Sequence, residues 1–157
     1  MHLYLGANCI VAKETIKSTL PENHSKKSQK AFEIYPRILT FIAEGKKLSV
    51  QDIEQLEETF GERVKKALEL IGAKKVKKYL FTPSGVSRWV VEGHEHAYLT
   101  LEHSFCSCKD FLFSSIMKRV IPSCYHLLAR ELAELSGKFE EIIVADEQYT
   151  TLIEEWL

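Results

Sequence analysis

The sequence predicts an α+β domain in which helices come first, strands follow and further helices end the chain. Apolar residues recur at helical spacing before Gly72, and short runs rich in β-branched and aromatic residues come after it. The chain has 157 residues, which suits one compact domain. Apolar residues make up 45% and charged residues 27% of the chain, a globular composition that excludes extensive disorder.

The first helix is predicted over residues 36–44. Apolar side chains recur at helical spacing there, and Pro36, which has no amide hydrogen, fits best in the first turn of a helix. Residues 1–30 show no sustained periodicity, and the polar stretch 21–28 is predicted to be a solvated loop. We therefore expect residues 1–30 to be irregular.

Two further helices are predicted before the strands. Ser49 and Asp52 have the spacing of a capping pair, so a helix should begin near Val50. Gly61 interrupts an apolar pattern that continues to Gly72. We expect two short helices there rather than one kinked helix.

The strands are predicted over residues 76–81, 86–91 and 97–101. Turn signals at residues 83–85 and 92–93 separate these runs. The pattern is that of a three-stranded antiparallel meander.

The chain is predicted to end in helices over residues 111–120, 125–135 and 149–156. Gly137 stops the second of these helices, and Asp146 is expected to cap the third.

Charge and cysteine content restrict the class of protein. Lys and Arg number 21 against 22 Asp and Glu, so the net charge of −1 gives no global attraction to nucleic acid or anionic lipid. No apolar run approaches the roughly 18 residues of a membrane helix, and residues 1–11 lack the features of a signal peptide. Three of the four cysteines cluster between residues 106 and 124, which suggests a metal site in a reducing compartment. We expect an intracellular protein without a membrane segment.

The sharpest motif is Cys106 and Cys108 followed by Cys124 and His126. Three thiolates and one imidazole suit tetrahedral zinc. Residues i and i+2 point to the same side of a strand, so the first pair can reach one ion where the meander ends. The second pair could not converge from the middle of a helix, but Pro122 favours Cys124 before a helix and His126 in its first turn. Four protein ligands leave no open position, so we expect one structural Zn²⁺.

Other interpretations of these residues are weaker. The motif could be three buried cysteines and an unrelated histidine, although the paired spacing argues against coincidence. A zinc deaminase is disfavoured, because no Pro-Cys-x-x-Cys follows and the glutamate lies between His94 and His96. Those two histidines could hold a second metal, but we expect them to be solvated. His103 is expected at the surface, with a place beside the metal as the alternative.

Cys-x-Cys followed by Cys-x-His is the pattern of the SWIM-type zinc finger. The chain lacks the Walker loop and kinase signatures of the large SWIM proteins. Over residues 55–157 it resembles the small SWIM subunits of Shu recombination-mediator complexes, whereas residues 1–48 match no family pattern. Besides the finger, the resemblance rests on Phe60-Gly61, Ala67 to Leu70, Thr82 to Gly85, Phe111, Phe113 and His126 to Ala129. We expect a single domain over residues 31–157, with a helical part 31–72 and a SWIM zinc-finger part 73–157.

The resemblance implies a non-enzymatic adapter in homologous recombination and DNA repair. Such a subunit forms a hetero-oligomer with a RecA-family paralogue ATPase, engages single-stranded DNA and helps recombinase filaments to assemble or persist. No small-molecule substrate is implied. The expected location is the nucleus of a eukaryote, or the cytoplasm and nucleoid of an archaeon or bacterium. Only the zinc ligands transfer residue by residue from the family.

Candidate DNA contacts come from a basic stretch, since residues 61–88 carry eight basic and two acidic side chains. Lysines can follow a phosphate backbone while Tyr79 or Trp89 offers a stacking face. Solvated lysines that guard an edge strand would give the same pattern. The candidates are Lys74, Lys75, Lys77, Lys78 and Arg88, together with Lys118 and Arg119 on the helix between the ligand pairs.

The last predicted helix carries one apolar stripe. It consists of Tyr149, Leu152, Ile153 and Trp156. Such a stripe either packs on its own domain or docks into a partner.

Two other functional classes remain as alternatives. One is a stand-alone zinc-finger regulator that binds nucleic acid, which a binding assay without any partner would separate from an adapter. The other is an enzyme, such as a metal-assisted hydrolase or a thiol reagent that uses Cys9. The closed ligand set and the lack of a recognisable nucleophile and base disfavour an enzyme, and Cys9 is expected to be an ordinary thiol.

Overall fold

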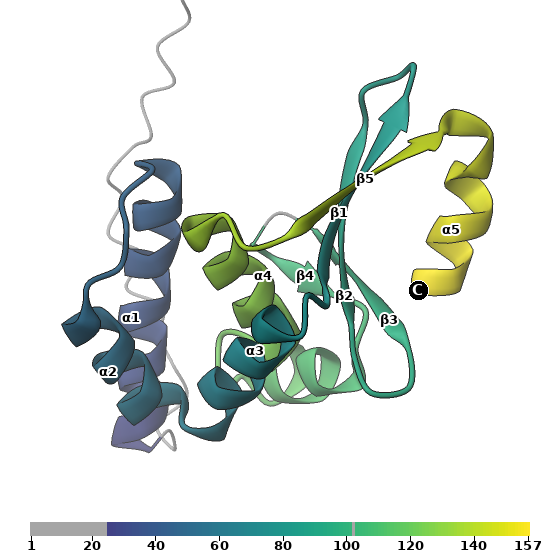
Figure 1. Ribbon diagram of the computed structural model, residues 1–157. Coiled ribbons are helices and arrows are strands. Elements are labelled where there is room, and N and C mark those ends of the chain that lie inside the picture. Colours follow the sequence, from purple (N-terminus) through teal and green to yellow (C-terminus); the bar gives the residue numbers. More distant parts are fainter. Residues whose placement is uncertain (1–24, 102) are drawn as a thin grey trace, which may run out of the picture.

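The computed structural model describes residues 25–101 and 103–157. A five-stranded sheet forms the centre, with α1 to α4 on one face and α5 on the other (Figure 1). The predicted α+β class is confirmed. Among the helices of the described residues, none is long and apolar enough to cross a lipid bilayer.

The first helix, α1 (Lys26–Ala43), begins ahead of the predicted position, so residues 26–30 are not irregular. Ser25 caps it by accepting a hydrogen bond from the amide of Ser28 at 3.2 Å. Pro36 lies inside the helix rather than in its first turn. Ile34 and Ile38, on either side of the proline, are buried in the core, and this packing outweighs the hydrogen bond that proline cannot donate.

The next two helices confirm the predicted capping pair and the break at Gly61. In α2 (Val50–Phe60), Ser49 and Asp52 form a complete capping box. Gly61 separates α2 from α3 (Glu62–Gly72) with φ 57° and ψ −128°, a conformation that residues with a Cβ rarely adopt. The chain therefore turns there and does not continue as one helix.

The sheet contains the predicted meander and two further strands. The meander is β1 (Val76–Thr82), β2 (Ser87–Glu92) and β3 (Ala97–Leu101), paired antiparallel. The strand β4 (Phe105–Cys106) extends it at one edge, and β5 (Glu140–Ala145) pairs parallel with β1 at the other, giving the order β4-β3-β2-β1-β5. Among the described residues the sheet therefore has five strands and not the three expected, because the chain pairs once more after β3 and returns beside β1 after α4.

The segments after the meander are mostly helical, as predicted. The first is a π-helix, η1 (Phe111–Met117), rather than an α-helix. It is followed by α4 (Tyr125–Ser136), which ends at Gly137 in the left-handed conformation. A 3-10 turn, η2 (Asp146–Gln148), leads into α5 (Tyr149–Trp156).

Asp146 does not cap α5, which differs from the prediction. Its carboxylate accepts hydrogen bonds from the amide and the hydroxyl of Ser84, at 2.9 and 2.7 Å. Asp146 therefore fastens the end of β5 to the turn between β1 and β2, because that turn offers two donors.

Two separate cores cover the faces of the sheet. The larger lies between the sheet and α1 to α4, and it includes Leu56, Val64, Val76, Val91 and Leu128, each at most 1% exposed. The smaller lies under α5 and is formed by Phe81, Val90, Leu99 and Trp156.

Candidate metal centre

The four predicted ligands meet where the sheet joins α4. Cys106 ends β4, Cys108 lies in the following turn, Cys124 is the N-cap of α4 and His126 lies in its first turn. One ligand atom from each lies within 4.8 Å of all the others. All four side chains are buried. The structure thus brings together residues that are eighteen positions apart along the chain.

Local hydrogen bonds orient two of the sulfur atoms. Cys124 has extended backbone angles, and its Sγ accepts a hydrogen bond from the amide of Leu127 at 3.4 Å. In the first pair, Sγ of Cys108 accepts one from the amide of Phe111 at 3.3 Å. Backbone amides at the start of a helix favour a negative sulfur, so both contacts suit a thiolate.

The buried groups of this cluster fit a metal cation. Both ring nitrogens of His126 are buried and have no hydrogen-bond partner among the described residues. Hydrogen bonds from Cys106 and Cys124 hold the pKa of the Cys108 thiol far below its usual range. A hydrogen bond to Cys108 raises the pKa of Cys106, and burial raises the pKa of Cys124 to about 12. Three buried thiols cannot all ionise without a cation, and zinc would supply that charge.

Two tyrosines and a glycine enclose the histidine, and sequence reasoning did not single them out. The ring centroids of Tyr98 and Tyr125 lie 4.4 and 3.9 Å from that of His126. A Cβ at Gly93 would lie 2.6 Å from the Tyr98 ring and 3.0 Å from Nε2 of His126. Gly93 is therefore a glycine because the ligand and its neighbouring ring fill the space. The glycine beside a strand was the available signal, since it often marks a close approach.

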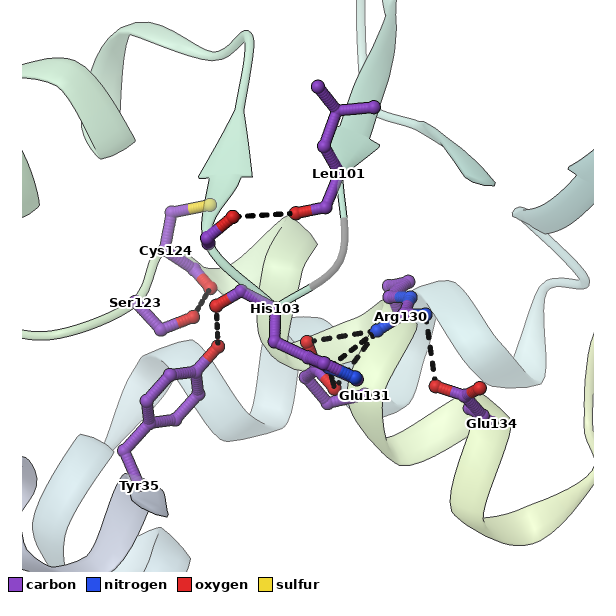
Figure 2. A network of polar contacts seen from close by, with 9 residues as sticks. Tyr35, Leu101, His103, Ser123, Cys124, Arg130, Glu131 and Glu134 are labelled. Carbon is purple, nitrogen blue, oxygen red and sulfur yellow. Dashed lines mark hydrogen bonds and ion pairs between the residues drawn. The ribbon is translucent and has the colours of Figure 1, made fainter. Parts of the chain in front are cut away.

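A polar network lies behind the metal centre, along α4 (Figure 2). Nδ1 of His103 lies 2.5 Å from a carboxylate oxygen of Glu131 and 2.6 Å from Nη1 of Arg130. Arg130 also pairs with Glu134 at 3.0 Å, and the hydroxyl of Tyr35 donates to the carbonyl oxygen of His103 at 3.4 Å. Burial of the Tyr35 hydroxyl raises its pKa.

This network occupies His103, so the histidine is neither a fifth donor for the finger nor a simple surface residue. Glu131 is fully buried and Arg130 is 3% exposed. His103, Glu131 and Glu134 lie close enough to hold a cation, but the guanidinium of Arg130 already supplies positive charge among them. Tyr35 belongs to α1, and Arg130, Glu131 and Glu134 belong to α4. The network therefore joins three parts of the fold, namely α1, α4 and the turn between β3 and β4.

The predicted DNA-binding lysines do not form one surface. Lys77 and Lys78 are neighbours on β1 and point to opposite faces of the sheet. Lys77 pairs with Glu92, and Lys78 pairs with Glu141 at 3.5 Å. Lys74 is exposed after α3, where no ion pair involves it among the described residues. The four lysines at 74, 75, 77 and 78 therefore do not line one surface, because successive side chains of a strand point to opposite faces of the sheet.

The proposed stacking faces and Arg88 are also engaged within the chain. Trp89 is 8% exposed and packs against Phe139 at 4.7 Å. Tyr79 packs against Trp156 at 4.6 Å, and Arg88 donates to the hydroxyl of Tyr149 at 2.7 Å. A base could not stack on Trp89, which corrects that expectation.

The remaining candidates are found in two places. Lys118 and Arg119 are exposed directly after η1. The apolar stripe of α5 faces its own sheet. Trp156 is 3% exposed, and Tyr149, Leu152 and Ile153 pack against the same core. Of the two interpretations of this stripe, packing on its own domain is the observed one.

His94 and His96 are exposed in the turn between β2 and β3 and do not lie on a strand face. The metal-ligand clusters found among the described residues include neither of them. Cys9 lies outside the described residues.

A two-residue cysteine knuckle and a Cys-x-His pair at a helix start, joined into one buried cluster, define a SWIM-type zinc finger. The chain is 33% identical over 121 residues to the "Zinc finger SWIM domain-containing protein 7 homolog" of Dictyostelium discoideum. The matched region covers 74% of this chain and 78% of that protein. It is 34% identical over 102 residues to "Zinc finger SWIM domain-containing protein 7" of Mus musculus, covering 64% and 66%. The chain therefore belongs to the family of zinc finger SWIM domain-containing protein 7.

Relatives also occur among archaea. An uncharacterized protein of Archaeoglobus fulgidus is 37% identical over 86 residues, which is 54% of this chain and 65% of that protein. No family model and no solved structure matches the chain. The family and the buried Cys₃His cluster together identify a zinc-binding centre.

Proposed function

We propose that this chain is a non-enzymatic adapter of homologous recombination that binds a RecA-family paralogue and assists single-stranded DNA binding or filament assembly. The observation that carries the proposal is the closed Cys₃His cluster in a member of this family. The partner and the pathway come from the resemblance to the small SWIM subunits of Shu complexes.

One structural zinc ion fits the proposal better than a catalytic one. Cys106, Cys108, Cys124 and His126 would hold the ion, and their burial leaves no coordination position for water or substrate. Bound zinc would fix the end of β4 to the start of α4. In this proposal the residues of the centre position a surface, and the burial of the four ligands supports that role.

DNA contact is proposed at a groove beside the finger. A groove of about 330 Å³ lies between α3 and the β2–β3 turn, and its lining includes Lys66, Lys75, His94 and Tyr125. Nζ of Lys66 lies 5.5 Å from the centre of the Tyr125 ring. Cations beside an aromatic face suit a single-stranded backbone and its bases. Of the candidates from the sequence, Lys75 lines this groove, whereas Lys74 lines a separate groove with Lys138 and Glu140.

Native co-purification tests the partner. The chain is tagged at either end, nuclease removes DNA bridging, and bound proteins are identified at moderate salt. Stoichiometric recovery of a RecA-family ATPase supports the adapter. Recovery of the folded, zinc-loaded chain alone favours the alternative of a stand-alone nucleic-acid-binding regulator.

A salt titration tests the groove. The double variant Lys66→Glu and Lys75→Glu should weaken binding to a single-stranded oligonucleotide. It should also flatten the slope of log affinity against log salt by about 1.4, since each lost phosphate contact removes about 0.7. The charge-matched control is Lys26→Glu with Lys47→Glu, two exposed lysines away from the groove. An unchanged slope in the first variant contradicts the groove.

A further inference from the structure

The segment between the two ligand pairs exposes a cluster of large apolar side chains. Leu112, Phe113, Ile116, Met117 and Val120 are between 41% and 65% exposed. They lie within nine residues, in η1 and directly after it. We call these five residues the η1 surface. Contiguous apolar patches of this kind mark interaction sites on soluble proteins.

The amphipathic pattern of η1 is inverted. The hydroxyl of Ser114 donates to the carboxylate of Asp110 at 2.7 Å. The hydroxyl of Ser115 is buried and has no partner among residues 25–101 and 103–157. A helix that only covered its own domain would place serines outward and Phe113 or Met117 inward. The outward apolar face is therefore not explained by packing within this chain.

The η1 surface is held in place at both ends. At its start, Phe111 is buried and its amide donates to Sγ of Cys108, while Asp110 pairs with Arg63 of α3 at 2.9 Å. At its end, the buried Ile121 leads to Cys124. In between, the amide of Lys118 donates to the carbonyl oxygen of Phe113 at 3.0 Å, an i→i+5 bond. π-helical turns are rare in proteins as a whole, and those that occur are often located at functional sites.

The rim of the surface is basic. Lys109, Lys118 and Arg119 are exposed and make no ion pair within the part of the chain that the structure describes. Asp110, the acidic side chain nearest to them in the sequence, is already paired with Arg63. A partner with acidic side chains around an apolar segment would complement this rim.

We propose that the η1 surface docks an apolar, acid-flanked segment of a protein partner, namely the RecA-family paralogue. This inference rests on the proposed function and names the surface by which it operates. A protein is favoured over single-stranded DNA because four of the five residues are aliphatic, whereas DNA-stacking platforms are aromatic. Zinc then has a defined purpose, because it fixes both ends of the docking segment.

The test compares two double variants of the full, zinc-loaded chain. Phe113→Ser with Met117→Ser removes two large members of the surface, which are 48% and 65% exposed. Val50→Ser with Ile143→Ser removes two apolar residues that are 76% and 67% exposed elsewhere, on α2 and β5. Affinity is measured by calorimetry against each purified RecA-family paralogue of the source genome. We expect at least a tenfold weaker Kd for the first variant and less than a twofold change for the control, with zinc content and Tm of both unchanged.

Each contrary result has a distinct meaning. If the wild-type chain binds a paralogue and the first variant binds equally well, this inference fails and the proposed function stands. If the wild-type chain binds no paralogue, both fail. A several-degree loss of Tm in the first variant would show that these residues pack on their own chain, and would overturn the inference. Self-association or oligonucleotide binding that only the first variant loses would assign the surface to a second copy or to DNA.

Discussion

The finger and the helical side of the sheet are stabilised in different ways. Within residues 25–101 and 103–157, the core between the sheet and α1 to α4 contains seventeen buried residues, all aliphatic or aromatic. Over the same residues, the cluster of the finger contains five buried residues, and three of these are the cysteines themselves. The finger even turns its large apolar side chains outward. Apolar burial therefore suffices for the helical side, whereas the finger depends on its ligands.

Removal of a ligand should have the largest effect. Cys106→Ser or His126→Ala should abolish zinc binding and unfold the segment from β4 to the start of α4, because metal binding contributes about 10–16 kcal/mol in small zinc domains. Hydrogen exchange would show lost protection in β4, η1 and the first turn of α4. Protection should be retained in α2, α3 and the rest of α4, whose buried residues belong to the larger core. Native protection of the finger without zinc would contradict the comparison.

The polar network between the two regions should have the next largest effect. Glu131→Gln leaves Arg130 buried without its fully buried partner, and breaking such a pair costs about 3–5 kcal/mol. Urea unfolding of the zinc-loaded chain measures the loss. Glu134→Gln is the control, since that side chain is 33% exposed and its loss should cost less than about 1 kcal/mol. Equal losses in both variants would show that burial of Glu131 is unimportant.

A methyl group added at Gly93, beside His126, should weaken the zinc finger and leave the helical side unchanged. Gly93→Ala places a Cβ against Tyr98 and His126, and overpacking of this kind costs about 1–3 kcal/mol. We expect faster zinc transfer to a chelator. Gly72→Ala is the control, because nothing lies within 4 Å of its Cβ position. An unchanged rate of zinc transfer in Gly93→Ala would show that Tyr98 and His126 can move to accept the added methyl group.

The smallest expected effect on the free energy of unfolding comes from a change on the helical side. Ser49→Ala removes a helix cap that contributes about 1 kcal/mol, without changing zinc content. Hydrogen bonds from Ser49 lower the pKa of Asp52 from 3.8. Their stabilisation is complete above the pKa of an unfolded aspartate and is lost as the pH falls through the lower folded value. Urea unfolding should show the difference between variant and wild type shrinking below about pH 4. A constant difference would contradict this role of Asp52.

Local signals predicted much of the fold. The capping box at Ser49, the break at Gly61 and the strands of the meander each depend on residues that are near one another in the chain. The second ligand pair was predictable for the same reason, since Cys124 and His126 flank the start of one helix. Ligand chemistry then joined this pair to the first.

Features that depend on distant partners were not predicted. The β5 strand has a β-branched run at Ile142 to Val144, but its place beside β1 is decided only when the chain returns from α4. Lys78 looked free because its partner Glu141 lies on that returning strand. The start of α1 was predicted wrongly from Pro36, because the packing that outweighs the proline's missing hydrogen bond comes from other helices.

The parallel pairing of β1 with β5 also governs when the domain can fold during synthesis. Lys77 pairs with Glu140, and Thr82 pairs with Ala145, so each contact spans more than sixty residues. The Ser107 hydroxyl donates to the carbonyl oxygen of Trp156 at 2.6 Å, which joins the knuckle to the last helix. Non-local contacts of this kind form slowly and late. A ribosome must therefore release the chain beyond β5 before the sheet can close, and until then the edge of β1 is exposed to chaperones and to other strands.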